Sequence, residues 1–139
     1  MSFDGAQFNE DGGFRGARFS RASGFRGVQF FKAAVFRGTH FNGDARFDLA
    51  RFGGDARFNN SEFHAAATFK GVEFQKNAAF QGAQFIGDAQ FDGTRFCNPV
   101  KFGHAHAKVT GEHVWPDGWR LEQTPPEALT GRIIYDSKS

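Results

Sequence analysis

The sequence is poor in cysteine and proline and lacks long apolar runs. Its 139 residues include one cysteine, Cys97, and four prolines. A single cysteine excludes an internal disulfide framework and is typical of a reducing compartment. No stretch approaches the ~20 apolar residues of a membrane-spanning helix, and no signal peptide opens the chain. We therefore expect one cytoplasmic domain without membrane contact.

An excess of either charge is also missing. The 17 Lys and Arg and 15 Asp and Glu residues give a formal net charge of +2 at pH 7, and the two signs are interleaved along the chain. Nucleic-acid-binding domains normally carry a stronger basic bias that is concentrated on one face. We therefore expect a partner other than nucleic acid.

Phenylalanine, in contrast, is abundant and regularly spaced. Nineteen of the 20 phenylalanines stand in one series from Phe3 to Phe102, with gaps of five and six residues in strict alternation, and only Phe31 lies outside it. The repeating unit is therefore eleven residues with two phenylalanines. A fixed period of this kind indicates a repeat architecture.

The spacing excludes both a helix and a flat sheet. Gaps of five and six scatter the rings around a helix, which turns ~100° per residue, and they place alternate rings on opposite faces of a strand. A chain that turns a corner after each Phe instead points every ring inward from a new wall. The residue two before each Phe is small or β-branched at all eighteen positions, as a second inward position beside a ring requires. Each six-residue gap adds one further residue, and several of these are the turn formers Asp, Asn and Pro.

Four walls of five, six, five and six residues make a coil of 22 residues. Outward charges favour this period over 18 or 20, because opposite charges on adjacent strands attract each other. The signs alternate at 22-residue steps in two columns, one with Asp4, Arg26, Asp48, Lys70 and Asp92, the other with Arg51, Glu73 and Arg95. The expected core is a ladder of rings that includes Phe25, Phe30, Phe36, Phe41, Phe47, Phe52, Phe58, Phe63, Phe69, Phe74, Phe80 and Phe85.

Units such as GARF, DARF and GAQF resemble the pentapeptide-repeat family in its phenylalanine-centred form. The resemblance covers residues 3 to about 103. It implies an all-β fold, a right-handed quadrilateral parallel β-helix (a solenoid) with four walls per coil. The regular sixth residue departs from the family's pattern, and a triangular left-handed β-helix with uniform six-residue units is the alternative fold. We divide the chain into a β-helix at residues 1–103 and a C-terminal capping segment at 104–139.

The tail is expected to cover the last coil, because an open coil end is an unpaired sheet edge over exposed core. WPDG predicts a β-turn, RIIY a strand and TPPEAL a short helical turn. The apolar residues available for this cap are Val109, Val114, Trp115, Trp119, Leu121, Ile133 and Ile134.

Few residues point to chemistry. His104, His106 and His113 form a metal-like grouping in the tail, but we interpret them as solvated histidines and predict no metal site. Cys97 follows a core ring and is expected to point outward without an activating neighbour. Nucleotide-binding and nucleophile motifs are absent, and a filled β-helix has no concave pocket. We therefore predict no enzyme activity and no cofactor.

A surface of the first two coils is the predicted interaction site. Arg15 and Arg37 are expected to stack on one wall, and Phe31 and Val35 are apolar at outward positions that flank one corner. Together they predict a contact for an acidic protein partner, and a solvated surface of mixed charge is the alternative. Ile86 is a further apolar residue at an outward position.

The leading functional hypothesis is a non-catalytic β-solenoid that binds or scaffolds an unknown protein partner. The resemblance implies an alternative, a DNA mimic that binds type II topoisomerase (DNA gyrase) and modulates quinolone resistance. Such members present a strongly acidic rod, whereas this repeat has 13 basic and ten acidic residues through position 102. Because the sequence enters the repeat at its third residue, we also predict a homodimer through the first coil, residues 1 to about 22.

Overall fold

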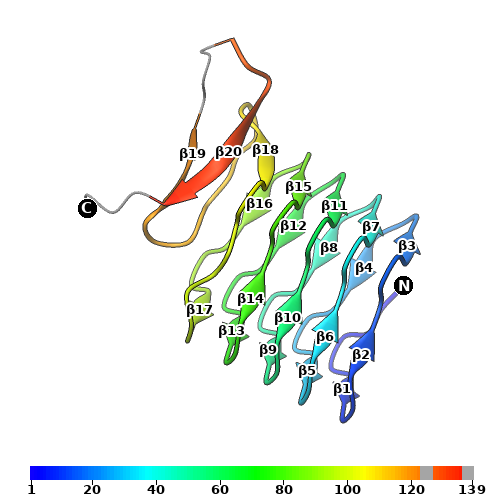
Figure 1. Ribbon diagram of the computed structural model, residues 1–139. Coiled ribbons are helices and arrows are strands. Elements are labelled where there is room, and N and C mark those ends of the chain that lie inside the picture. The colour runs from blue at the N-terminus through cyan, green and yellow to red at the C-terminus, as the bar shows by residue number, and fades with distance from the viewer. Residues whose placement is uncertain (123–126, 136–139) are drawn as a thin grey trace.

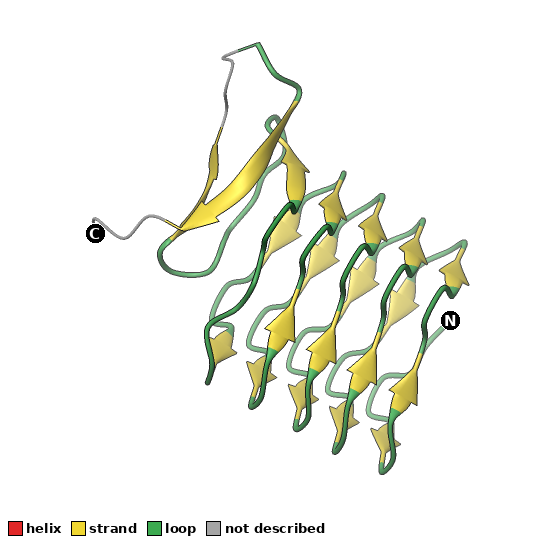
Figure 2. Ribbon diagram, viewed as in Figure 1, coloured by secondary structure: helices red, strands yellow, loops and turns green. Residues whose placement is uncertain are grey.

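The computed structural model describes residues 1–122 and 127–135, which form a β-solenoid of about five turns (Figure 1). Short strands and tight corners alternate, and the described residues contain no helix (Figure 2). They therefore also contain no helix of the length and hydrophobicity that a membrane span needs. A C-terminal hairpin lies over the last coil.

Each wall of the solenoid is one sheet whose coil strands are parallel, and the sheet of the fourth wall continues into two antiparallel strands of the tail. The first wall has β4 (Ser23–Gly24), β8 (Ala45–Arg46), β12 (Ala67–Thr68) and β16 (Ala89–Gln90). The second has β1 (Gln7–Phe8), β5 (Gln29–Phe30), β9 (Arg51–Phe52), β13 (Glu73–Phe74) and β17 (Arg95–Phe96). The third has β2 (Gly12–Gly13), β6 (Ala34–Val35), β10 (Ala56–Arg57) and β14 (Ala78–Ala79). The fourth has β3 (Arg18–Phe19), β7 (His40–Phe41), β11 (Glu62–Phe63), β15 (Gln84–Phe85) and β18 (His106–Lys108), followed by β20 (Thr130–Tyr135) and β19 (Trp119–Glu122).

The predicted 22-residue coil is confirmed. Parallel partners in the strands of all four walls are 22 residues apart, as Phe30 and Phe52 are on the second wall and His40 and Glu62 are on the fourth. Four sheets fit the quadrilateral solenoid and exclude the triangular alternative, which has three walls. Any outward residue therefore lies in a column with the residues 22 positions before and after it.

The core is a continuous lattice of phenyl rings. Phe36 stacks on Phe58 with ring centroids 4.9 Å apart and planes 1° apart, and it meets Phe47 edge-on at 5.4 Å and 90°. Offset and edge-to-face arrangements are those that aromatic pairs prefer. The twelve rings predicted for the ladder, from Phe25 to Phe85, are the largest fully buried side chains among the described residues. The interior is therefore filled by side chains.

The two gap lengths form two kinds of corner. After each Phe of the first and third walls the chain makes a tight turn whose third residue has positive φ, for example 61° at Gly27. The amide of Val28 donates to the carbonyl of Phe25 across this turn. The six-residue corners lack the positive φ, and their Asp carboxylates bond to the next coil instead. Asp44 Oδ1 accepts from the amide of Ala66 at 3.1 Å.

The tail covers the last coil with aromatic side chains. Trp115 continues the first-wall stack above Phe91, with centroids 5.9 Å apart and planes 27° apart. Trp119 meets Phe102 edge-on at 4.9 Å, and Ile133 is buried. Val114, in contrast, is exposed, because it occupies an outward position beside Gln90 on the first wall.

The local predictions for the tail are confirmed where the structure describes them. The amide of Trp119 donates to the carbonyl of Pro116, which closes the turn predicted from WPDG one residue later than expected. The RIIY segment lies in β20, which pairs antiparallel with both β18 and β19. The predicted helical turn in TPPEAL falls partly on residues 123–126, outside the described residues.

Candidate functional site

The outward surface of the third wall carries most of the predicted interaction residues. We call this surface the basic face and define it by the residues on either side of Phe14, Phe36, Phe58 and Phe80, together with Lys101. Backbone bonds from Gly16 to Arg37 and from Gly38 to Asn59 keep these positions in columns. The basic side chains of this wall therefore all lie on one side of the solenoid, because the backbone of each coil fixes the position of its own residue. The basic face consists of Gly13, Arg15, Val35, Arg37, Arg57, Asn59, Ala79, Gln81 and Lys101.

Cations outnumber available carboxylates on the basic face. Asp55 Oδ2 pairs with Arg57 at 3.6 Å, and its Oδ1 accepts from the amide of Asn77. Within the described residues, Arg15, Arg37 and Lys101 have no carboxylate within ion-pair distance. The basic face therefore carries a net positive charge.

A shallow groove of about 270 Å³ runs along the basic face. Ala79 is among its lining residues, and its short outward side chain leaves space between the longer ones. Asn59 and Gln81 are bonded to each other along one side at 3.1 Å. The other residues that line it include Arg37, Asp55, Arg57, Asn77 and Lys101.

The two predicted apolar residues lie on the same coil, Val35 within the basic face and Phe31 beside it. Phe31 is 52% exposed at the corner that leads from the second wall to the third. Val35 is half-buried in β6, where it pairs with Gly13 on one side and Arg57 on the other. Ile86 is half-buried beyond β15 on the fourth wall and does not belong to this surface.

The tail histidines have separate structural roles. His106 Nδ1 lies 3.0 Å from the carbonyl of His104, which occupies a corner with a φ of 59°. His113 Nδ1 accepts from the amide of Ala89 at 3.0 Å, and its Nε2 lies 2.7 Å from the carbonyl of Lys108. His113 thus replaces the backbone carbonyl that would continue the first-wall ladder. Its Nδ1 therefore joins the tail to Ala89 in β16, whereas its Nε2 contacts Lys108 of β18 within the tail.

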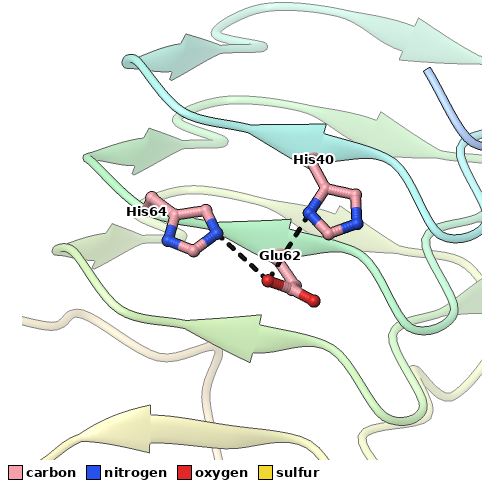
Figure 3. Close-up of side chains that lie close together, drawn as sticks. All are labelled: His40, Glu62 and His64. Atoms are coloured by element: carbon pink, nitrogen blue, oxygen red, sulfur yellow. Dashed lines mark hydrogen bonds and ion pairs between the residues drawn. The ribbon is translucent and has the colours of Figure 1, made fainter. Parts of the chain in front are cut away.

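A different group of side chains on the fourth wall was not predicted. His40 in β7 and Glu62 in β11 are register partners, and His64 follows two residues after Glu62 (Figure 3). Glu62 Oε1 lies 3.0 Å from His64 Nε2 and 3.5 Å from His40 Nδ1. We call these three residues the histidine–glutamate cluster. The 22-residue column and the Glu62-x-His64 spacing together are the sequence signal that could have found it.

The cap also creates a groove that the expectation of a filled β-helix did not include. It has a volume of about 790 Å³ and lies between the last coil and the C-terminal hairpin. Exposed Cys97 borders it, and none of the described residues that line it is an arginine or a histidine. The lining side chains include Phe96, Cys97, Val100, Pro116, Trp119 and Tyr135.

Comparison with known proteins gives one result for the repeat region. A family model described as pentapeptide repeats (9 copies) matches residues 25–73 and 69–109. Together these ranges run from residue 25 to residue 109, which is more than half of the 139 residues. No curated protein and no solved structure matches the chain. The matched range includes Phe31, Val35, Arg37 and the histidine–glutamate cluster, whereas Arg15 precedes it.

Proposed function

The chain belongs to the pentapeptide-repeat family, and from this premise we propose that it is a non-catalytic protein-binding module whose basic face takes an acidic segment of a protein partner. The observation that carries the proposal is the alignment of Arg15, Arg37, Arg57 and Lys101 on one wall beside a shallow groove. A solenoid of this kind offers extended, rigid surfaces for recognition.

The filled interior supports a role for the outer surface. Phenyl rings occupy the centre of every coil, so a ligand has no space inside the solenoid. Ligand sites of enzymes are normally concave and enclosed. The groove on the basic face is shallow and lined mostly by polar and charged residues, which suits a polypeptide segment better than an enclosed small molecule.

Charge and exposed apolar area act together at this surface. Opposite charge on a partner would speed the encounter and fix its orientation. Phe31 stands at the edge of the basic face with about half of its side chain exposed, and aromatic residues are frequent anchors of interfaces. An acidic segment with an apolar residue near one end is therefore the partner that this surface fits.

The alternative of a DNA mimic is less well supported. Such a protein competes with DNA by presenting a negative surface, and the basic face has the opposite sign. Glu73 between Arg51 and Arg95 on the second wall is likewise outnumbered by cations. A gyrase supercoiling assay with excess protein tests this alternative, and we expect no inhibition.

The proposal is tested with two matched charge reversals. Arg37→Glu with Arg57→Glu changes the basic face, whereas Arg26→Glu with Arg46→Glu makes the same change in charge on the first wall. Partners captured from the native host are purified, and their binding to each variant is measured as a function of salt. We expect the basic-face variant to bind at least about tenfold more weakly than the first-wall variant, with wild-type binding falling as salt rises.

Two results would contradict the proposal. Equal loss in both variants would mean that net charge, rather than the basic face, governs binding. A salt-dependent shift of duplex DNA by the wild-type protein, abolished by the basic-face variant alone, would instead assign the surface to nucleic acid.

A further inference from the structure

The repeat region has only two histidines, and both of them lie against the same carboxylate. His40 and His64 are the sole histidines between residues 1 and 103, and Glu62 Oε1 is within 3.5 Å of a ring nitrogen of each. We propose that the histidine–glutamate cluster is a Zn²⁺-binding site. This inference goes beyond the proposed protein-binding function and involves a different wall of the solenoid.

The distances suit a common metal ion with little rearrangement. One ligand atom from each of the three side chains can be chosen so that all lie within 4.8 Å of one another. In a tetrahedral zinc site the bonds are about 2.0–2.1 Å long, which places ligand atoms roughly 3.4 Å apart. The two measured separations from Glu62 Oε1, 3.0 and 3.5 Å, bracket this value. Only the two imidazoles have to approach each other, and Figure 3 shows both rings on the same side of the wall.

The solenoid holds the three backbone positions in place. The amide of Glu62 donates to the carbonyl of Thr39, and the amide of His64 donates to that of Phe41, both at 2.9 Å. Phe41 and Phe63, the residues that follow His40 and Glu62, are buried in the core, and their rings are stacked with centroids 4.9 Å apart. Because the chain is already ordered, binding a metal would restrict only the side-chain rotamers.

The site is open on its outer side. The side chains of His40, Glu62 and His64 are 30%, 32% and 36% exposed, so an ion can reach them from solvent. Two histidines and one glutamate are the protein ligands of zinc sites that keep a fourth position for water. We therefore expect one protein-bound zinc with a water in the remaining position.

Another triad in the same solenoid shows why the residue type matters. On the second wall, Glu73 lies between Arg51 and Arg95, at 3.2 and 3.9 Å. Its geometry is similar, but a guanidinium has no lone pair to offer and serves only as an ion-pair partner. Neutral imidazole does have one, so the cluster with histidines can bind a metal ion.

The test is calorimetric titration of untagged, metal-free protein with zinc chloride. We expect one site per chain with a dissociation constant in the micromolar range or tighter. His64→Ala and Glu62→Gln should each weaken binding at least tenfold. His106→Ala is the matched control, because His106 lies three coils beyond His40 and one beyond Gln84 in the same column of the fourth wall, and it should bind as wild type does.

Two further measurements separate binding from folding. Thermal melting in the presence of a chelator should show the same transition for wild type and for the three variants, since the substituted side chains are at least partly exposed. Cobalt(II) should give the visible absorption of a tetrahedral site in wild type and lose it in His64→Ala. The proposal is overturned by the absence of stoichiometric zinc binding, or by binding that His64→Ala leaves unchanged. Glu62 would then be only an ion-pair partner between two imidazoles.

Discussion

Phe52 and Phe74 are 22 residues apart in the sequence, and their rings are stacked with centroids 4.9 Å apart and planes 7° apart. Phe52 also meets Phe58 edge-on at 6.0 Å. Each central ring thus contacts rings above, below and beside it. Removing one ring leaves a void that rigid neighbouring coils cannot close.

Phe52→Ala is therefore expected to lower the free energy of unfolding by about 3–5 kcal/mol, as large truncations in a core do. Lys70→Ala, an exposed change on the first wall, should alter it by less than about 0.5 kcal/mol. Urea denaturation measures both. Similar losses for the two variants would show that Phe52 is not interior.

A second prediction concerns the corner residues that have a positive φ, the left-handed backbone conformation. Leu49 has a φ of 63° and is 70% exposed, at the position that Gly27 occupies one coil earlier. A residue with a side chain loses roughly 1–2 kcal/mol of stability when it adopts this left-handed conformation. Glycine avoids this cost, but it loses more conformational entropy on folding, which offsets part of the gain. Leu49→Gly should therefore raise the free energy of unfolding by about 0.5–1 kcal/mol.

Gly27→Ala is the reciprocal control. An added Cβ at Gly27 would meet nothing within 4 Å, so any loss reflects backbone conformation alone. We expect a loss of about 1 kcal/mol. If Gly27→Ala is neutral and Leu49→Gly destabilises, the corner does not have the left-handed conformation described.

Asp44 links two coils through its side chain. Its Oδ1 accepts from the amide of Ala66, a bond in a partly buried position, so Asp44→Ala should cost about 1–2 kcal/mol. Asp92→Ala is the comparison, because this exposed carboxylate has no such bond among the described residues. Equal effects in denaturation would mean that the Asp44 bond does not stabilise the corner.

The period of the sequence predicted the fold because a phenyl ring recurs at the same inward position of every wall, with a small or β-branched residue two before it. The hydrogen-bond partners of outward side chains were harder to predict, because several possible partners lie within reach of each. The alternation of Asp48 and Lys70 suggested an attraction between side chains, yet Asp48 Oδ1 accepts from the backbone amide of Lys70 at 3.2 Å. A short carboxylate reaches the adjacent backbone more easily than the end of a long side chain.

The basic face, the histidine–glutamate cluster and the cap also differ in how far the 22-residue period predicts them. The stacking of Arg15 and Arg37 follows directly from the 22-residue column. The histidine–glutamate cluster follows from it too, but His40 and Glu62 become neighbours only when the sequence is arranged in coils. The cap could not be placed by period, since His113 bonds to Ala89 at a separation of 24 residues.

The homodimer through the first coil stays a prediction. Among the described residues, β1, β2 and β3 each pair with a strand on one side only. A two-fold contact between first coils would satisfy those edges. Light scattering at micromolar concentration should give a dimer mass, and Gln7→Pro, which removes an edge donor on β1, should give a folded monomer. A monomer mass for the unchanged protein would rule the contact out.

The most direct test of the account is a disulfide cross-link across the basic face, because every surface described depends on the 22-residue coil. On a Cys97→Ser background, Val35→Cys with Arg57→Cys places two thiols on adjacent strands in register. Adjacent parallel strands are about 4.8 Å apart, within the range that a disulfide spans. Val35→Cys with Asp55→Cys tests a 20-residue period instead. We predict rapid oxidation of the 35/57 pair and little of the 35/55 pair; preferential cross-linking of the 35/55 pair would contradict the coil, and with it the basic face and the histidine–glutamate cluster.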